Sequence, residues 1–221
     1  METKEQKKKN KIKIGKILYR IVVAILLLIL VMLCMNSVKM KKEDDKYKMQ
    51  VKSTLRTGPI QRNLRNKETI KIKDAEITKL AEYDITGVVI GEEFFYFGGG
   101  ANRISNRDLT LCWGPIISEK YFDDVKTIYG INDRMATINF SGDIVKDYGD
   151  SAINFVSNNH IIPLNSTVKN KLRKVKKGDT VQILGWLVDC KGDGWNWGPS
   201  SLVRNDSGCE IILVKYLSII K

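Results

Sequence analysis

Fifteen apolar residues follow one another without interruption from Ile21 to Met35, and no other feature restricts the fold of this 221-residue chain as strongly. The apolar stretch extends over residues 17–35, with Arg20 as its one charge. A helix of that length is about 28 Å long, close to the thickness of the hydrocarbon core of a bilayer. The sequence therefore predicts a single transmembrane helix.

Three alternatives to a membrane span fit the residues of this stretch less well. A cleaved signal peptide needs small residues at its cleavage site, and residues 32–37 have no such pattern. A lipoprotein signal needs a small residue before its cysteine, but here the large residue Leu33 precedes Cys34. A buried helix of a soluble domain would need a cover, which the lysine-rich residues 1–16 cannot supply. We therefore expect an uncleaved signal-anchor.

The net charge of +12 is concentrated near this helix. Residues 1–75 carry 20 basic and 7 acidic side chains, whereas residues 76–221 carry 17 and 18. A basic segment next to a membrane favours anionic lipid headgroups or an anionic surface polymer as its partner. Because the remainder of the chain is nearly neutral, nucleic-acid binding by the folded domain is disfavoured.

The basic residues also predict the orientation of the helix. Eight precede the apolar run, and six lysines follow it within a comparable distance. Because positively charged flanks stay in the cytoplasm, we expect residues 1–16 to form a cytoplasmic leader. The C-terminal domain is then anchored to the cell membrane and lies outside the cytoplasm.

Beyond the anchor, residues 36–56 have the composition of a basic juxtamembrane linker, and residues 57–221 that of one globular domain. One helix is expected at 166–175, with Asn165 or Ser166 as its N-cap. We predict a β-rich α+β domain, compatible with a small, partly open barrel. Alternating or apolar runs predict strands at 69–73, 83–90, 92–97, 134–140, 180–188 and 209–217, with a mixed apolar run at 108–113.

Several sequence blocks occur in a fixed order over most of the soluble part. They are Gly58-Pro59-Ile60-Gln61, Asp108-Leu109 with Trp113-Gly114-Pro115, Asn159-His160-Ile161-Ile162-Pro163, Gly178-Asp179 with Gly185 and Leu187-Val188, and Trp197 through Ser200-Ser201, Arg204, Asp206 and Gly208 to Cys209-Glu210. In these blocks the chain resembles a family of bacterial proteins with an N-terminal hydrophobic segment. The resemblance implies a membrane-anchored architecture and no particular activity.

The polar residues of the last block, together with the only histidine, suggest a catalytic site. Any histidine-dependent general base must be His160, with Cys209 or Ser201 as the nucleophile. The alternative, which the sequence favours, is a self-bonded loop with a structural role. Separation of His160 by more than about 8 Å from its possible partners would exclude catalysis, because a general base needs hydrogen-bond reach. The candidates are His160, Ser201, Arg204, Asp206, Cys209 and Glu210.

Tryptophans and cysteines offer further hypotheses. Trp195 and Trp197 are spaced to face one side and would form a ligand platform or cover the core. A disulfide between Cys190 and Cys209 is expected if the domain is exported, because a hairpin would bring them together. With one histidine and no C-x-x-C pair, the sequence predicts neither a metal site nor a cofactor.

Two functions follow from these features. The first is a binding or structural module at the cell envelope that acts on an envelope protein or an anionic surface polymer. The alternative is a membrane-tethered hydrolase that uses His160 with Cys209 or Ser201. The sequence favours the first, because it has no recognisable catalytic motif.

The predicted orientation can be tested with a reporter fused after Lys221. A reporter that is active only after export should give signal, because the basic leader holds the N-terminus in the cytoplasm. The same fusion with the leader lysines changed to glutamate is the control, and its signal should fall. Activity of a cytoplasm-specific reporter at this position would contradict the prediction.

Overall fold

The structure is a computed structural model, and it describes residues 16, 18–38, 51–96, 98–130, 134–198, 200, 202 and 208–220. The chain separates into two compact units, Met1–Met49 and Gln50–Lys221, and we describe each by itself.

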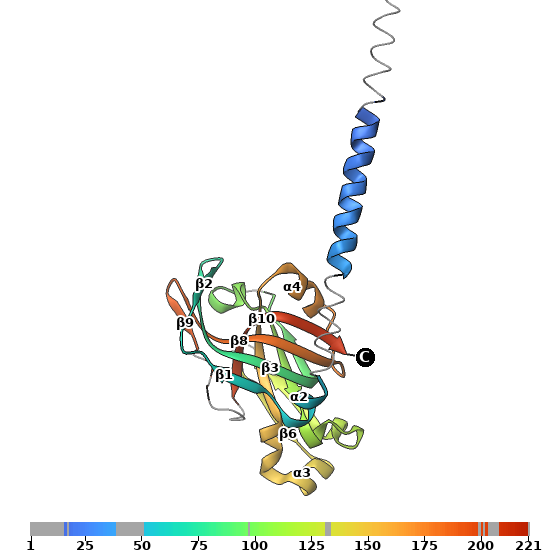
Figure 1. Cartoon of the computed structure of the whole chain (residues 1–221). Coiled ribbons are helices and arrows are strands. Elements are labelled where there is room, and N and C mark those ends of the chain that lie inside the picture. The colour runs from blue at the N-terminus through green and yellow to red at the C-terminus, as the bar shows by residue number, and fades with distance from the viewer. Residues whose placement is uncertain are drawn as a thin grey trace, which may run out of the picture. The chain divides into compact units, whose positions relative to one another are not determined.

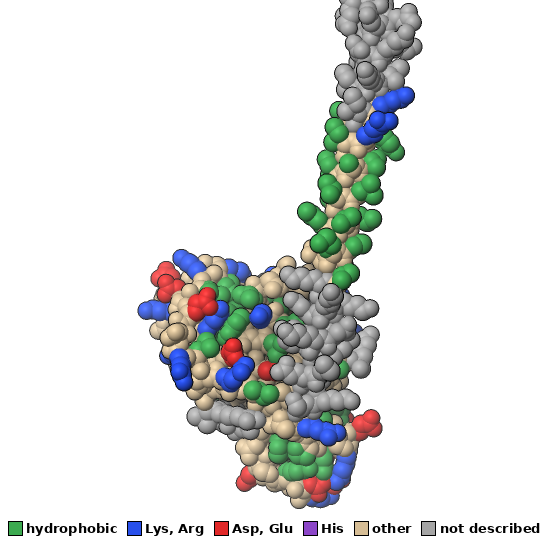
Figure 2. Space-filling model, viewed as in Figure 1, with side chains coloured by type: hydrophobic (Ala, Val, Ile, Leu, Met, Phe, Trp, Pro, Cys, Tyr) green, Lys and Arg blue, Asp and Glu red, His purple; other side chains and the backbone are tan. Residues whose placement is uncertain are grey.

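The first unit contains one long helix, Leu18–Val38, none of which is buried within the protein. Apolar side chains cover it (Figure 2), and it is long and apolar enough to cross a membrane. Its bounds agree with the predicted span to within three residues at either end. The apolar run thus forms one continuous helix.

The second unit is rich in strands and has few helices, which confirms the predicted β-rich α+β class (Figure 1). Its strands are β1 Ile60–Asn63, β2 Thr69–Ile72, β3 Ala75–Phe94, β4 Arg107–Cys112, β5 Val125–Tyr129, β6 Ala136–Phe140, β7 Val156–Pro163, β8 Thr180–Gly192, β9 Trp195–Trp197 and β10 Cys209–Ile220. Its helices are α2 Val51–Thr57, α3 Gly142–Tyr148 and α4 Ser166–Leu172, with four 3-10 turns, η1 Gly100–Arg103, η2 Gly114–Ile117, η3 Glu119–Asp124 and η4 Gly149–Phe155.

Several elements differ from the sequence prediction, which did not include β1, β5, β7, β9 or α3. The strands expected on either side of Gly91 are one strand, β3, with a bulge before Gly91. Helix α2 begins inside the expected linker, and buried Thr54 on it hydrogen-bonds Thr86 at 2.7 Å. Helix α4 ends three residues early, while Asn165 caps it as predicted by accepting a hydrogen bond from the Val168 amide at 3.0 Å.

The ladders of the main sheet connect five strands in a circuit. Residues 76–88 of β3 pair with β8, and residues 88–94 pair with β4. Strand β4 pairs with β7, β7 pairs in parallel with β10, and β10 returns to β8. The barrel suggested by the sequence is not clear-cut, because the circuit closes only through one long strand that pairs over different parts of its length.

Apolar residues fill one side of this circuit. Leu109, Ile161, Ile183 and Ile212 are fully buried in one cluster. The apolar side of α4 completes it with Val168 and Leu172, which are 2% and 3% exposed. Strand alternation therefore directs the neighbouring residues of β4 and β7 to the opposite face. That face carries the candidate site.

Gly185 of β8 lies between β3 and β10, opposite Tyr83 and Val214. A Cβ atom here would be 2.1 Å from the carbonyl oxygen of Leu213. We expect Gly185→Ala to lower the free energy of unfolding by about 2–3 kcal/mol, because the backbones must separate. Gly99→Ala is the control, since its Cβ would meet nothing within 4 Å. Denaturant unfolding of both variants tests this, and equal effects would contradict the close approach.

Candidate functional site

The register of three adjacent strands collects polar side chains on one face of the sheet. Asp108 of β4 lies opposite His160 of β7, and Thr110 lies opposite Asn158. In the parallel ladder, Cys209 of β10 also lies opposite Asn158. Because paired residues point to the same side of a sheet, these five side chains share a face. The ladders thus bring together residues that are far apart in sequence.

These groups are withdrawn from solvent. Asp108 is 0% exposed, and Asn158 and His160 are each 3% exposed, whereas Cys209 is only partly buried. Burial of a carboxylate and an imidazole is costly unless each has polar or charged partners. The arrangement of those partners therefore determines what the site can do.

Asp108, His160 and Cys209 lie in series. Nδ1 of His160 is 2.8 Å from Oδ2 of Asp108, in a close charge contact in which the ring N–H does not point along the line to that oxygen. The imidazole also lies close enough to the Cys209 thiol to lower the pKa of that thiol. A histidine thus lies between a carboxylate, which orients it, and a potential nucleophile. Among the described residues, no group of three such side chains is arranged to hold a metal ion.

The environment shifts the pKa values of the imidazole and the thiol in opposite directions. Burial, the largest effect on His160, lowers its pKa, but the contacts with the Asp108 and Cys209 side chains and the charge of Asp108 outweigh it. The pKa of His160 is therefore raised. The hydrogen bond from His160 lowers the pKa of Cys209 against the opposing effect of burial. Both shifts favour a thiolate beside an imidazolium.

Arg134 closes the site from the segment before β6. Its guanidinium pairs with Asp108 and donates to the carbonyl oxygen of Ser105 at 2.7 Å. It also lies over the rings of Phe95 and Trp197, at 4.4 and 4.5 Å. Its positive charge compensates the buried carboxylate, and the two aromatic faces shield the pair from water.

Asn158 is the polar group on the other side of the thiol. Its Nδ2 atom is 3.8 Å from the Cys209 sulfur. Its Oδ1 accepts a hydrogen bond from Thr110 at 3.3 Å. Thr110 also hydrogen-bonds Tyr129 at 2.7 Å, which fixes its side chain. An amide N–H held next to a nucleophile is a suitable donor to an oxyanion that forms there.

The structure brings together some of the candidates from the sequence and separates others. His160, Cys209 and Trp197 meet, with the rings of His160 and Trp197 4.9 Å apart. Trp195 and Trp197 both pack against the apolar cluster that contains Ile77. Glu210 follows Cys209 in β10 and therefore leaves the sheet on the opposite face. Three candidates lie outside the described residues: Ser201, Arg204 and Asp206.

Sequence reasoning did not include Asp108, Arg134 or Asn158 among the catalytic candidates. For Asp108 a signal was present, because a carboxylate that opens the apolar run DLTLC must be either exposed or paired inside the protein. Arg134 and Asn158 join the site only through the pairing of strands. No local pattern marks them.

The expected disulfide is not formed, and Cys190 and Cys209 are both free thiols. Cys190 is fully buried in an apolar cluster, and Trp197 of β9 is its partner across the ladder. The turn after β8 thus places Trp197 beside Cys190, whereas the sequence analysis expected Cys209 to be the neighbour of Cys190. Cys209 contacts His160 instead.

Comparison of the chain with protein-family models, curated proteins and solved structures gives no match. The site itself is therefore the basis for a functional assignment.

The rate at which iodoacetamide alkylates Cys209 should rise with pH, with an apparent pKa below the ordinary thiol value of about 8.5. His160→Gln should raise that apparent pKa, because the hydrogen bond from the imidazole is the largest cause of the shift. Rates can be read by peptide mass spectrometry over a pH series. Cys112 and Cys190, whose pKa values burial raises to about 12, are internal controls. The same pH profile in both proteins would contradict the assignment.

Proposed function

We propose that this chain is a membrane-anchored thiol hydrolase, with Cys209 as the nucleophile, His160 as the acid and base, and Asp108 as the residue that orients His160. The position of the His160 imidazole, with Nδ1 2.8 Å from Asp108 and close enough to the Cys209 thiol to lower its pKa, carries this proposal. The sequence favoured a binding module. An enzyme would have been excluded if His160 lay far from every possible catalytic partner. Contact with both a thiol and a carboxylate moves the enzyme to first place.

The proposed reaction is transfer of an acyl group to water. The Cys209 thiolate attacks the carbonyl carbon, and the resulting oxyanion accepts a hydrogen bond from Nδ2 of Asn158. The imidazolium of His160 gives its proton to the leaving group, which leaves a thioester on Cys209. Neutral His160 then takes a proton from water, and the hydroxide attacks the thioester. Collapse of that intermediate releases the carboxylic acid and restores the thiol.

We further propose that Leu18–Val38 anchors the enzyme in the cell membrane, with the domain outside the cytoplasm. The length and apolar surface of the helix support the anchor, and the basic leader supports the orientation. The basic residues next to the helix suit anionic headgroups or an anionic surface polymer. The substrate would then be a component of the envelope.

A binding module is the second candidate, and the connectivity of the strands favours it. The order β3-β4-β7-β10-β8, with the parallel pair β7–β10 and α4 between β7 and β8, resembles that of the OB-fold. Proteins of that fold bind oligosaccharides and oligonucleotides over the second and third strands. Here β4 and β7 are those strands, and they carry the polar site. Fold analogy gives no chemistry by itself, so the binding module stays in second place.

The hydrolase can be tested with p-nitrophenyl acetate and the full chain in neutral detergent micelles. We expect a burst of p-nitrophenolate of about one equivalent per protein, because acylation of a thiolate is faster than hydrolysis of the thioester. Intact mass spectrometry should locate the acetyl group on Cys209. Cys209→Ser should abolish the burst, and His160→Gln should slow it by about 100-fold or more.

Cys190→Ser is the matched control, because that thiol is fully buried in an apolar cluster. It should keep the full burst. The melting temperature of each variant separates loss of chemistry from loss of folding. An undiminished burst in folded His160→Gln would contradict the proposed role of the imidazole, and the absence of any burst in the wild type would favour the binding module.

A further inference from the structure

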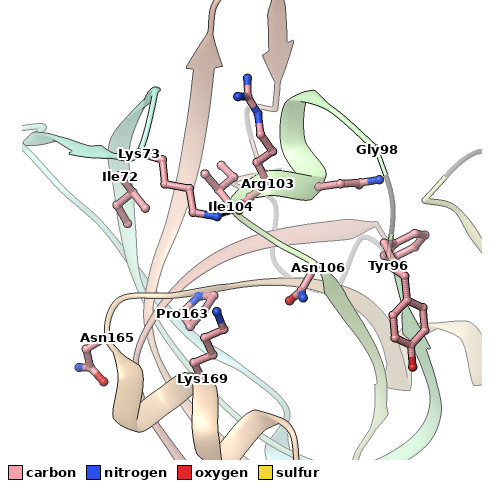
Figure 3. A pocket seen from close by; sticks show the side chains of 12 residues that line it. Ile72, Lys73, Tyr96, Gly98, Arg103, Ile104, Asn106, Pro163, Asn165 and Lys169 are labelled. Atoms are coloured by element: carbon pink, nitrogen blue, oxygen red, sulfur yellow. Dashed lines mark hydrogen bonds between the residues drawn. The ribbon is translucent and has the colours of Figure 1, made fainter.

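A pocket lies beside the candidate site, between the turn that joins β2 to β3, the 3-10 turn η1 and the start of α4 (Figure 3). Its volume is about 340 Å³, which is at the small end of the range for pockets that bind small molecules. In the view of Figure 3, Lys73 and Lys169 enter the space from different sides, with Asn106 to the right of both.

The charged residues that line this pocket are all basic, namely Lys73, Arg103 and Lys169. Arg103 is already paired with Asp74, and its guanidinium points away from the space in Figure 3. Lys73 donates to the carbonyl oxygen of Arg103, which leaves two of its three N–H groups for another acceptor. The pocket thus has positive charge and polar donors but no lining carboxylate.

The backbone of Lys73 gives a second reason to regard its side chain as functional. Lys73 has φ of 55°, and it is the only non-glycine residue with positive φ among the described residues. It lies in the two-residue turn between Ile72 and Ala75, which are paired across the hairpin. Such turns favour asparagine or glycine. A lysine there is strained, and strained residues of this kind cluster at ligand-binding sites.

The pocket shares two residues with the surroundings of the proposed catalytic groups. Asn102 lines it and accepts a hydrogen bond from Nη1 of Arg134 at 3.4 Å. Phe95 lines it and lies under the same guanidinium, at 4.4 Å. Because Arg134 also pairs with Asp108, the lining residues Asn102 and Phe95 connect the pocket to the buried carboxylate through this guanidinium.

From this geometry we infer that the pocket binds the anionic group of the substrate, a phosphate or a carboxylate, through Lys73 and Lys169. That the bound anion belongs to a substrate rests on the proposed hydrolase, but binding of the anion does not require the thiol. It narrows the substrate class to acyl compounds that also carry an oxyanion. Arg134 then keeps the bound anion apart from Asp108.

The test uses the full-length Cys209→Ser protein in neutral detergent micelles, with inorganic phosphate and acetate as probes. The rise in melting temperature with probe concentration, measured against chloride at constant ionic strength, gives a dissociation constant. We expect at least one of the two anions to stabilise the protein more than chloride. The comparison of phosphate with acetate identifies the preferred oxyanion.

Two variants separate a binding role from a structural one. Lys169→Gln should raise the dissociation constant about tenfold, because one charged donor is lost. Lys73→Asn should weaken binding to a similar degree without lowering the melting temperature of the free protein, since asparagine suits the turn. Lys174→Gln is the matched control, because Lys174 is exposed just beyond α4 and does not line the pocket. It should change binding by less than about twofold.

The outcomes distinguish this inference from the proposed hydrolase. Phosphate and acetate that stabilise no more than chloride would overturn the anion pocket, whatever the acetyl burst shows. Equal weakening by Lys174→Gln and Lys169→Gln would also overturn it, because the effect would then be one of net charge. Specific weakening in Lys73→Asn and Lys169→Gln supports the pocket even if Cys209 never forms a thioester.

Discussion

The parallel ladder between β7 and β10 places Cys209 opposite Asn158, two residues from His160 on the same face, and the candidate site depends on that pairing. A parallel pair cannot be joined by a tight turn, so the chain must leave β7 and return through α4, β8 and β9. Closing so long a connection costs conformational entropy. Full burial of Ile212 and Leu213 on β10 offsets that cost through apolar contacts. The same ladder that stabilises the core therefore assembles the chemistry.

The electrostatics of the site follow from burial. Arg134 pairs with Asp108, Asp108 contacts the His160 imidazole, and the imidazole lowers the pKa of the Cys209 thiol. In an interior of low dielectric constant, such contacts are stronger than in water, and the loss of one partner leaves the next group uncompensated. The series therefore acts as one unit. The rings of Phe95 and Trp197 lie against Arg134 and shield its ion pair with Asp108 from water.

Local patterns predicted much of the fold. Alternation predicted β6 and β8, and the cap residue Asn165 fixed the start of α4, because these signals depend only on neighbours in sequence. The break expected at Gly91 was wrong because a glycine in a strand can also serve a close approach, here by Thr127 of β5, whose Cβ would be 2.6 Å from a Cβ atom at Gly91. The disulfide was expected because β8 and β10 were predicted to form a hairpin. The chain forms β9 between them, and Trp197 of β9 lies opposite Cys190.

By itself the sequence determined the apolar helix, the near-neutral strand-rich domain, and the fact that any histidine chemistry must use His160. These properties depend on composition and on contacts over a few residues, which a sequence records directly. Only the tertiary structure decided that Asp108 and Cys209 both reach that histidine and that Arg134 compensates the buried carboxylate. Those contacts depend on the register between strands that are distant in the chain. A register is set by how all the strands share one core, so no segment carries it alone.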